Sequence, residues 1–131
     1  MRQTAAKIFG VVFLAVGILG FVPQAMDGCK LLGLFCVNPA HNMVHLLSGA
    51  IALAVGLSSE VASIWYFRIF GVVYGLVAIL GYSSGDAPLL GVIANNMHDV
   101  WLHALISLAS LTLGFLPAKN KLPTTPATRF N

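Results

Sequence analysis

The sequence predicts an all-α integral membrane protein, a four-helix bundle built from two tandem two-helix hairpin repeats. Three observations predict it: the scarcity of charge, the spacing of charge-free runs and an internal repeat. Of the 131 residues, 8% are charged and 58% are hydrophobic, whereas a soluble domain carries about 25% charged residues. Seven basic and four acidic side chains cannot cover a water-exposed surface. This composition excludes an ordinary soluble enzyme, a disordered chain and a nucleic-acid-binding protein of the usual kind.

The charge-free runs place the helices. A spanning helix needs about 20 mostly apolar residues. The run over residues 31–59 is too long for one helix, and Asn38-Pro39 divides it, because Asn caps helix N-termini and Pro suits the first turn. The four predicted helices cover approximately residues 4–22, 39–57, 61–82 and 97–116.

An internal repeat sets the architecture. Residues 7–21 align with residues 68–82 at an offset of 61, and nine of the fifteen positions are identical. Three further matches share an offset of 58: Asn38 with Asn96, His45 with His103, and Gly56 with Gly114. We therefore expect one hairpin at about 4–57 and a second at about 61–116. Parallel copies of this kind are related by a pseudo-two-fold axis along the membrane normal.

The basic residues predict the orientation. Six of the seven belong to the termini and the second loop, whereas Lys30 lies on the other side with the acidic Asp27, Asp86 and Asp99. Because basic residues favour the cytoplasmic side, both termini are expected in the cytoplasm, with the chain in the plasma membrane. Residues 1–117 form the transmembrane domain in this interpretation, and residues 118–131 form a cytoplasmic polar tail.

Two motifs carry a resemblance to a known family. The stretch over residues 33–46 reads G-L-F-C-V-N-P-A-H-N-M-V-H-L, and the stretch over residues 96–103 reads N-M-H-D-V-W-L-H. From Lys7 to Leu116 the chain resembles a family of bacterial four-helix membrane proteins of unknown function, with a G-L-F-x-V-N-P-x-H-N-x-x-H-L motif before the second helix. The chain departs from this family at Val100, where Asn is frequent. The resemblance implies the four-helix fold and supplies no activity.

Two polar stripes on the second and fourth predicted helices contain the candidate site residues. His41, His45, Gly49, Ala52 and Gly56 share one helical face, and Asp99, His103, Ser107, Ser110 and Gly114 share another. Small residues let membrane helices approach closely, so we expect the two stripes to face each other. This arrangement would bring four side chains together at the outer ends of the helices: His41, His45, Asp99 and His103. His98 falls on a different face.

Three imidazoles and one carboxylate suit a divalent metal, Zn or Cu. A hydrogen-bonded polar network without metal is the simpler interpretation and ranks first. Haem b, with His45 and His103 as axial ligands, ranks behind a metal ion. A proton-linked role is the remaining alternative, because ionisable residues within a membrane often serve function.

The outer loops and the glycines leave further alternatives. For Cys29 and Cys36, two free buried thiols are favoured over a disulfide, and Cys36 as a soft metal ligand is the third alternative. The apolar segments 31–35 and 89–93 are expected to anchor at the membrane interface rather than to cover the histidines. Gly71-x-x-x-Gly75 is expected to pack within the bundle rather than in a homodimer.

The function that the sequence favours is that of a small accessory or structural membrane protein with an outer-face His/Asp polar cluster, which is a candidate site for a divalent metal. A haem or metal electron carrier and a minimal proton-coupled carrier are the alternatives. Enzymatic activity is not favoured, because the sequence has no glycine-rich phosphate loop, no G-x-S-x-G and no H-E-x-x-H. The expected partners are the lipid bilayer and either further copies of the chain or a larger membrane complex, with no nucleic acid.

Overall fold

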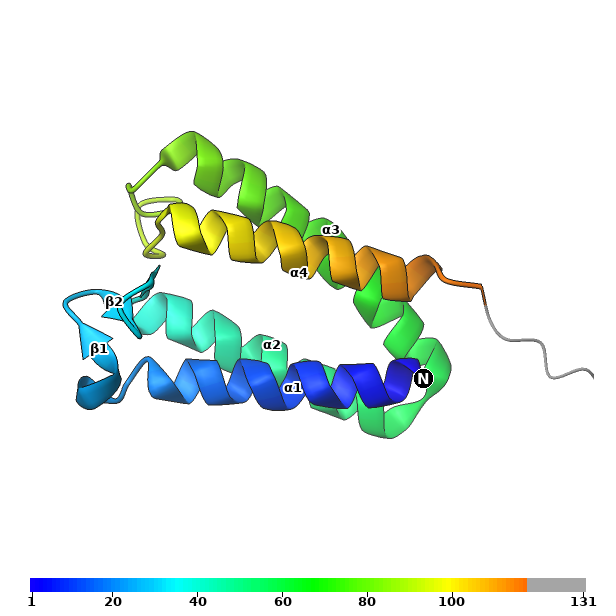
Figure 1. Cartoon of the computed structure of the whole chain (residues 1–131). Helices are drawn as coiled ribbons and strands as arrows, with labels where there is room; N and C mark the ends of the chain where they lie inside the picture. The colour runs from blue at the N-terminus through cyan, green and yellow to red at the C-terminus, as the bar shows by residue number, and fades with distance from the viewer. Residues whose placement is uncertain (118–131) are drawn as a thin grey trace, which may run out of the picture.

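The computed structural model describes residues 1–117, so the predicted polar tail at 118–131 lies outside the described residues. Four helices make up most of this part of the chain (Figure 1): α1 (Arg2–Leu19), α2 (Pro39–Ser58), α3 (Glu60–Ser84) and α4 (Met97–Phe115). Every helix begins and ends within three residues of the predicted bounds. The prediction of a mostly helical protein with four helices is therefore confirmed.

Three of the helices, α1, α2 and α3, are long and apolar enough to cross a membrane. We predicted four spans, but α4 is not among the candidates found in residues 1–117. The reason lies in its first two turns, where His98, Asp99 and His103 lower the mean hydropathy of a 19-residue helix.

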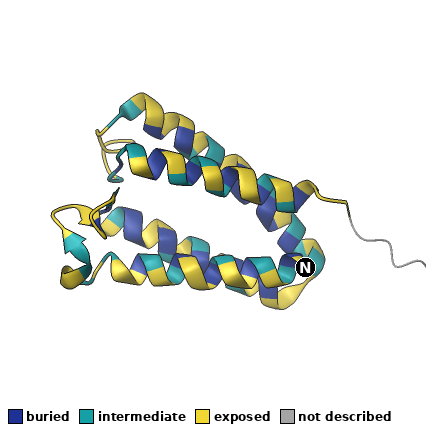
Figure 2. Ribbon diagram, viewed as in Figure 1, coloured by how far each residue is buried: buried dark blue, intermediate teal, exposed yellow. Residues whose placement is uncertain are grey.

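The outward faces of the helices are apolar. Figure 2 shows the buried residues on the faces that the helices turn toward one another, with exposed residues on the outside. Large apolar side chains on these outer faces stay open, for example Leu57 (73% exposed), Ile79 (65%) and Leu105 (63%). Exposed apolar surface of this extent is typical of a protein that is surrounded by lipid or by partner subunits.

Side-chain caps fix the beginnings of three helices. The side chain of Asn38 accepts from the His41 amide, and Pro39 occupies the first turn of α2. Ser59 accepts from the Ala62 amide at the start of α3. Asn96 begins α4 in the same way. These caps satisfy amides that have no partner inside the helix, which is why the bounds follow the local sequence so closely.

α1 packs along α2, and α3 packs along α4, as two hairpins (Figure 1). A Cβ atom added at Gly10 would lie 2.9 Å from the backbone nitrogen of Leu53, and one added at Gly71 would lie 2.9 Å from that of Leu111. Glycine therefore lets the backbones of each hairpin approach closely. Gly71 and Leu111 follow Gly10 and Leu53 by 61 and 58 residues. Positions that are related by these two offsets are called matched positions below.

Small residues of the two polar stripes pack within the hairpins, contrary to our prediction that the stripes face each other. A Cβ atom at Gly49 would lie 2.9 Å from the carbonyl oxygen of Gly10. Ser107 Oγ donates to the carbonyl oxygen of Gly71 over 2.7 Å. The spacing identifies the shared face, but the antiparallel neighbour in the same hairpin occupies it. The prediction for Gly71-x-x-x-Gly75 is confirmed, because a Cβ atom at Gly75 would lie 2.9 Å from Ser107 Oγ.

Aromatic side chains of α1 and α3 join the two hairpins. The rings of Phe9 and Phe67 meet edge to face with centroids 5.2 Å apart, and those of Phe13 and Phe70 do so at 5.3 Å. Edge-to-face pairs add about 0.5–1.5 kcal/mol to the stabilisation from buried area. The hairpins therefore meet along a central row of rings, while α2 and α4 lie to either side of it.

A small antiparallel sheet forms in the first loop, which the all-α prediction did not include. It has three two-residue strands in the order β1 (Met26–Asp27), β2 (Lys30–Leu31) and β3 (Phe35–Cys36), after a short 3-10 turn over Pro23–Ala25. Leu31 in β2 is 2% exposed. The sheet and the loop between α3 and α4 lie at the same end of the bundle (Figure 1).

A buried arginine holds the opposite end together. Arg2 is 4% exposed, and its Nε donates to the carbonyl oxygen of Leu113 over 2.7 Å. Its Nη2 donates to the carbonyl oxygen of Leu116, and its Nη1 lies 3.3 Å from Glu60 Oε1. The guanidinium group thus connects α1 to the carboxyl end of α4, where the helix dipole favours a positive charge.

Candidate metal centre

Three of the four predicted site residues meet inside the bundle, near the end that carries the sheet. One ring nitrogen from each of His41, His45 and His103 lies within 4.8 Å of the others. The three residues are 3%, 7% and 4% exposed. His41 Nε2 and His45 Nε2 are 3.0 Å apart across one turn of α2. The cluster therefore combines a pair on α2 with a single imidazole from α4.

The tautomer of His41 is set by the loop between α3 and α4. His41 Nδ1 lies 2.9 Å from the carbonyl oxygen of Ala94, which can only accept, so Nδ1 carries the proton. The lone pair of this ring is then on Nε2, the atom that faces His45. Histidines that bind metals almost always donate their other N–H to a carbonyl or carboxylate in this way. His41 is thus prepared to act as a ligand through Nε2.

Asp99 does not join the three histidines. It is buried at 2% exposure, but its Oδ2 accepts from the Asn96 amide over 2.9 Å and from the Cys36 amide over 3.1 Å. The first bond is half of a capping box at the start of α4. The carboxylate is therefore engaged with backbone amides of its own helix and of the first loop. His98 is exposed, as its position on a different face predicts.

His103 is the least satisfied of the three. Its Nδ1 is buried and has no hydrogen-bond partner among residues 1–117. Its ring meets that of Tyr74 edge to face at 5.4 Å, and that of His41 at 5.8 Å. A buried polar atom without a partner costs about 1–3 kcal/mol. A hydrogen-bonded network without metal therefore does not explain why His103 Nδ1 is buried without a partner.

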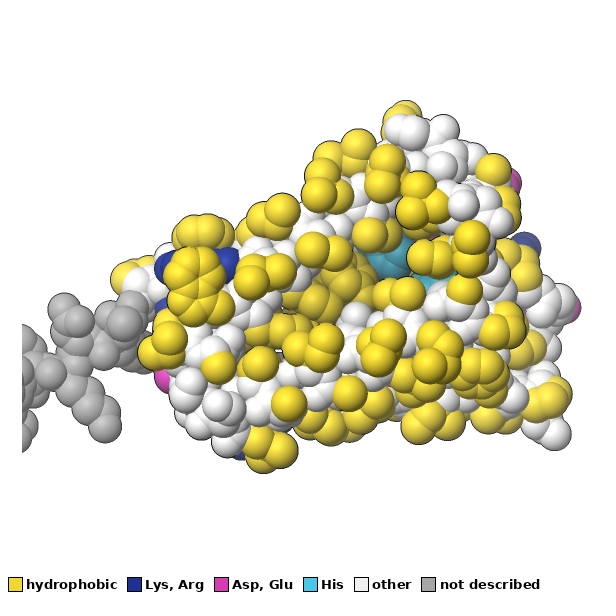
Figure 3. Space-filling model, turned by 180° about the vertical axis from the view of Figure 1, so that it is seen from behind, with side chains coloured by type: hydrophobic (Ala, Val, Ile, Leu, Met, Phe, Trp, Pro, Cys, Tyr) yellow, Lys and Arg dark blue, Asp and Glu magenta, His cyan; other side chains and the backbone are white. Residues whose placement is uncertain are grey.

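A cavity of about 470 Å³ lies beside the cluster, between α2 and α3. Its lining includes all three histidines, together with Leu89 and Ile93 of the loop before α4. Figure 3 shows histidine side chains at the base of this hollow, surrounded by apolar side chains. We expected the segment 89–93 to anchor at the interface rather than to cover the histidines, and two of its residues line the cavity beside them. The histidines therefore have free space on one side.

A second, smaller cavity of about 220 Å³ lies between α1 and α4. Five of its lining residues match five in the larger cavity at an offset of 61: Ile8, Phe9, Val12, Phe13 and Val16 correspond to Ile69, Phe70, Val73, Tyr74 and Val77. His45 lines both cavities. The two spaces thus lie at matched positions on either side of the histidines.

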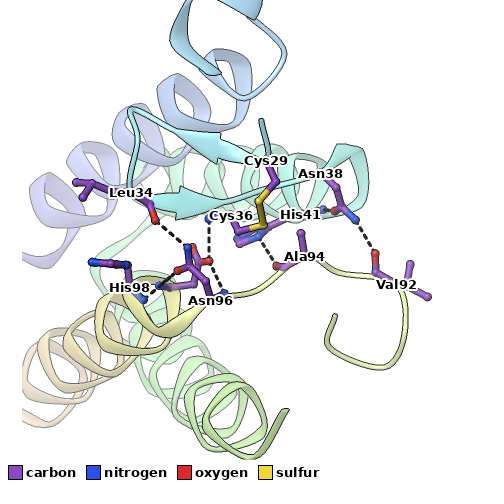
Figure 4. Close-up of a disulfide and its surroundings, with 10 residues drawn as sticks. Cys29, Leu34, Cys36, Asn38, His41, Val92, Ala94, Asn96 and His98 are labelled. Carbon is purple, nitrogen blue, oxygen red and sulfur yellow. Dashed lines mark hydrogen bonds between the residues drawn. A yellow bond between two sulfur atoms is a disulfide. The ribbon is translucent and has the colours of Figure 1, made fainter. Parts of the chain in front are cut away.

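Hydrogen bonds between the two loops hold the cluster in place (Figure 4). Asn38 Nδ2 donates to the carbonyl oxygen of Val92 over 2.8 Å, and Asn96 Nδ2 donates to that of Leu34 over 2.8 Å. The two donors, Asn38 and Asn96, are matched positions, and so are the two acceptors, Leu34 and Val92. The bond from His41 to Ala94 and that from the Cys36 amide to Asp99 form a second matched exchange.

Cys29 and Cys36 form a disulfide, with Cα atoms 4.9 Å apart, so the preference for two free thiols was wrong. Cys29 directly precedes β2, and β2 pairs with β3, which contains Cys36. The linear spacing of the two cysteines does not reveal this pairing. The disulfide lies beside His41 and Ala94 in Figure 4. It therefore braces the loop that supplies the amide of Cys36 to Asp99, and Cys36 is not available as a soft metal ligand.

Residues 3–116 match the family described as a domain of unknown function (DUF4383). The chain belongs to this family. The match confirms the resemblance to a family of unknown function, and it covers the four helices of this DUF4383 protein except for Arg2. No curated protein matches the chain. No solved structure matches it either.

Two polar residues beside the histidine cluster of this DUF4383 protein, Tyr74 and Ser48, were not predicted from the sequence. Tyr74 Oη and Ser48 Oγ lie 3.3 Å apart, and both residues line the larger cavity. The repeat offered a signal, because Phe13 stands at the position that matches Tyr74, and Ile106 at the position that matches Ser48. At both positions the matched residues therefore differ in polarity.

Proposed function

We propose that this DUF4383 protein spans the membrane four times as two tandem hairpins about a pseudo-two-fold axis. Three matched exchanges of hydrogen bonds support this proposal. Two lie in the loops, and the third lies at the opposite end, where Arg2 Nε donates to Leu113 and Ser63 Oγ donates to Val55. Arg2 and Ser63 differ by 61, and Val55 and Leu113 differ by 58. In this arrangement the apolar remainder of α4 spans the bilayer, while its polar first turns lie beneath the loops.

The proposed orientation places both termini in the cytoplasm of a bacterial inner membrane. The disulfide supports it, because the loop with Cys29 and Cys36 would then face an oxidising compartment. Among the Lys and Arg residues of the described part of the chain, 1–117, Lys30 lies on that side, whereas Arg2 and Arg68 lie toward the other. Residues 118–131 would continue into the cytoplasm as the polar tail, and the bilayer would cover the apolar outer faces, with further copies or a larger complex as additional partners.

We further propose that His41, His45 and His103 bind one transition-metal ion, Zn or Cu. The convergence of three buried imidazoles from two helices carries this proposal. Metal–nitrogen bonds of about 2.0–2.1 Å require ligand atoms that lie within a few ångströms of one another, as these do. The cavity beside them leaves a further coordination position open. Asp99 is assigned a positioning role through the loop rather than a place among the ligands.

Charge favours copper in its +1 state over Zn²⁺ at this site. Three neutral imidazoles bring no negative charge, and Asp99 already accepts two backbone hydrogen bonds. A buried ion that is not neutralised is costly, and the cost rises with its charge. Haem fits poorly, because His41 Nε2 lies 3.0 Å from His45 Nε2, which leaves no room for a porphyrin on that nitrogen.

Metal analysis of purified protein tests the proposal. The protein is extracted without chelator, and Zn and Cu are quantified; the same protein is then stripped and titrated with Zn²⁺ and with Cu⁺ in ascorbate. We expect about one ion per chain. His45→Ala and His103→Ala should each weaken binding at least about 10-fold. His98→Ala, an exposed imidazole on the same helix, is the matched control and should bind normally.

The Asp99→Asn variant distinguishes a metal site of three histidines from a site in which the Asp99 carboxylate is also a ligand. The three-histidine site predicts that this variant keeps its ion, whereas a carboxylate ligand predicts a loss as large as that of His103→Ala. If the stripped wild type binds neither ion more tightly than His45→Ala does, the metal proposal is wrong. The histidines then form a structural polar network.

A further inference from the structure

The larger cavity has a polar end that a metal site does not explain. Tyr74 Oη lies 3.3 Å from Ser48 Oγ, and either atom can be the donor. A bond between two hydroxyl groups uses one of their two hydrogens, so the other remains available to a third group. Tyr74 is 4% exposed, and both residues line the cavity. The pair can therefore donate one hydrogen bond to an oxygen atom inside the cavity.

A second polar atom lies farther along the same wall. Tyr66, two helical turns before Tyr74 on α3, also lines the cavity, and its Oη is buried without a hydrogen-bond partner among residues 1–117. Burial of a hydroxyl group without a partner is unfavourable, because the group has given up its hydrogen bonds to water. The rings of Tyr66, Phe70 and Tyr74 follow one another along the helix, with centroids 4.7 Å and 4.2 Å apart. The wall thus combines flat aromatic surface with hydroxyl groups.

The matched cavity between α1 and α4 shows that the fold does not need these hydroxyl groups. Phe13 and Ile106 line that cavity at the positions that match Tyr74 and Ser48. Both are apolar, and the space beside them is about 220 Å³ rather than about 470 Å³. One copy of the hairpin therefore packs with apolar side chains where the other has two hydroxyl groups and twice the space. The hydroxyl groups and the added space are therefore not a requirement of the hairpin fold.

The mouth of the larger cavity opens on an apolar face of the protein (Figure 3). The residues at its rim are exposed and apolar, among them Ile51 (55%), Trp65 (56%) and Ile69 (61%). A molecule that enters here must first dissolve in the surroundings of that face, which in the proposed orientation is the bilayer. The route of entry selects lipophilic molecules before any specific contact is made.

We infer that the cavity between α2 and α3 binds a compact lipophilic molecule that carries a hydroxyl or carbonyl oxygen. Its apolar body packs on Phe70 and the aliphatic wall, and its oxygen hydrogen-bonds to Tyr74 and Ser48. The volume lies within the range of about 300–1,000 Å³ that is usual for small-molecule sites. The inference goes beyond the proposed metal site and does not require an ion.

Two probes that differ by one hydroxyl group test this inference: 2-naphthol and naphthalene. Their binding is measured as a saturable rise in the thermal unfolding midpoint of the full chain in detergent micelles, with EDTA present so that no metal contributes. We expect 2-naphthol to bind about 5-fold more tightly than naphthalene, the value of one hydrogen bond of about 1 kcal/mol. A metal site that fails in its own titration leaves this measurement unaffected.

Variants locate the binding. Tyr74→Phe should reduce the preference for 2-naphthol to less than about 2-fold while naphthalene binds as before. Ser48→Ile introduces the residue of the matched cavity and should abolish the binding of both probes; Ile51→Trp, at the exposed rim, serves if Ser48→Ile fails to fold. Tyr82→Phe, 68% exposed and away from the cavity, is the matched control. The inference is overturned if the two probes bind equally or if neither shows saturable binding. It is also overturned if Ile51→Trp leaves binding intact. In each case lipid chains alone occupy the cavity.

Discussion

Asn38 and Asn96, 58 residues apart, each begin a helix and each donate a hydrogen bond to the loop that precedes the other. Asn38 Nδ2 reaches the carbonyl oxygen of Val92, and Asn96 Nδ2 reaches that of Leu34, both over 2.8 Å. Each side chain therefore caps its own helix with its oxygen and ties the two hairpins together with its nitrogen. The same residues position His41 and Asp99 in the first turn of each helix.

The two functions of these asparagines are separable by substitution. Asn38→Ala or Asn96→Ala removes both, and should lower the free energy of unfolding by about 1–3 kcal/mol. Aspartate retains the oxygen acceptor but cannot donate, so Asn38→Asp and Asn96→Asp should lose less, about 1 kcal/mol. Unfolding in mixed micelles measures both series. Equal losses for Asp and Ala would show that the bonds between the loops contribute all of the effect.

Close helix packing predicts that Gly10→Ala and Gly71→Ala are both destabilising. The added Cβ atom at Gly71 would lie 2.7 Å from Leu111 Cγ and 2.9 Å from the Leu111 backbone nitrogen. The helices of that hairpin must then separate, at a cost of about 1–3 kcal/mol. Leu111→Ala in the same chain removes the side-chain clash but not the backbone clash, so rescue should be partial. Full tolerance of alanine at Gly71, measured by thermal unfolding, would contradict the close approach.

Arg2 and Glu60 should differ in their contributions although they form one ion pair. The Arg2 side chain is 5% exposed and also donates to backbone carbonyl oxygens of α4, whereas that of Glu60 is 40% exposed. Arg2→Met should lower the free energy of unfolding by about 2–3 kcal/mol, because carbonyl groups lose their donor. Glu60→Gln should cost less than about 1 kcal/mol, as is usual for exposed pairs. If the two variants lose the same stability, the ion pair between α1 and α3 rather than the carbonyl contacts between α1 and α4 accounts for the contribution of Arg2.

The disulfide should stabilise the first loop and report its side of the membrane. Cys29→Ser together with Cys36→Ser opens a short loop, and the chain-entropy account predicts a loss of about 2–3 kcal/mol. In intact cells, a membrane-impermeant reductant followed by an impermeant maleimide should label both cysteines, because the loop is proposed to face outward. Labelling only after the membrane is permeabilised would reverse the proposed orientation.

The helix bounds could be predicted because their signals are local. Asn38-Pro39 and Asn96 specify where α2 and α4 begin, whatever the rest of the chain does. The role of Asp99 was also readable, since Asn96-x-x-Asp99 has the spacing of a capping box; its residue type suggested a metal ligand instead. The three histidines could be grouped because His45 and His103 match at an offset of 58, which predicted that they lie near the same end of their helices.

The features that could not be predicted from the sequence depend on which surfaces of the helices and loops contact one another. Helical spacing shows that Gly49 and His45 share a face, but not that α1 covers the glycine while His103 approaches the histidine. The pairing of Cys29 with Cys36 depends on a sheet of two-residue strands that have no periodic pattern. The environment of Tyr74 depends on a void, which is a property of the packed helices and not of any segment.

His45 forms part of the wall of both cavities, one on each side of the bundle. The two cavities therefore share one imidazole as part of their lining. A turn of that ring changes the wall of both, so a guest in one chamber and the shape of the other are coupled through one side chain.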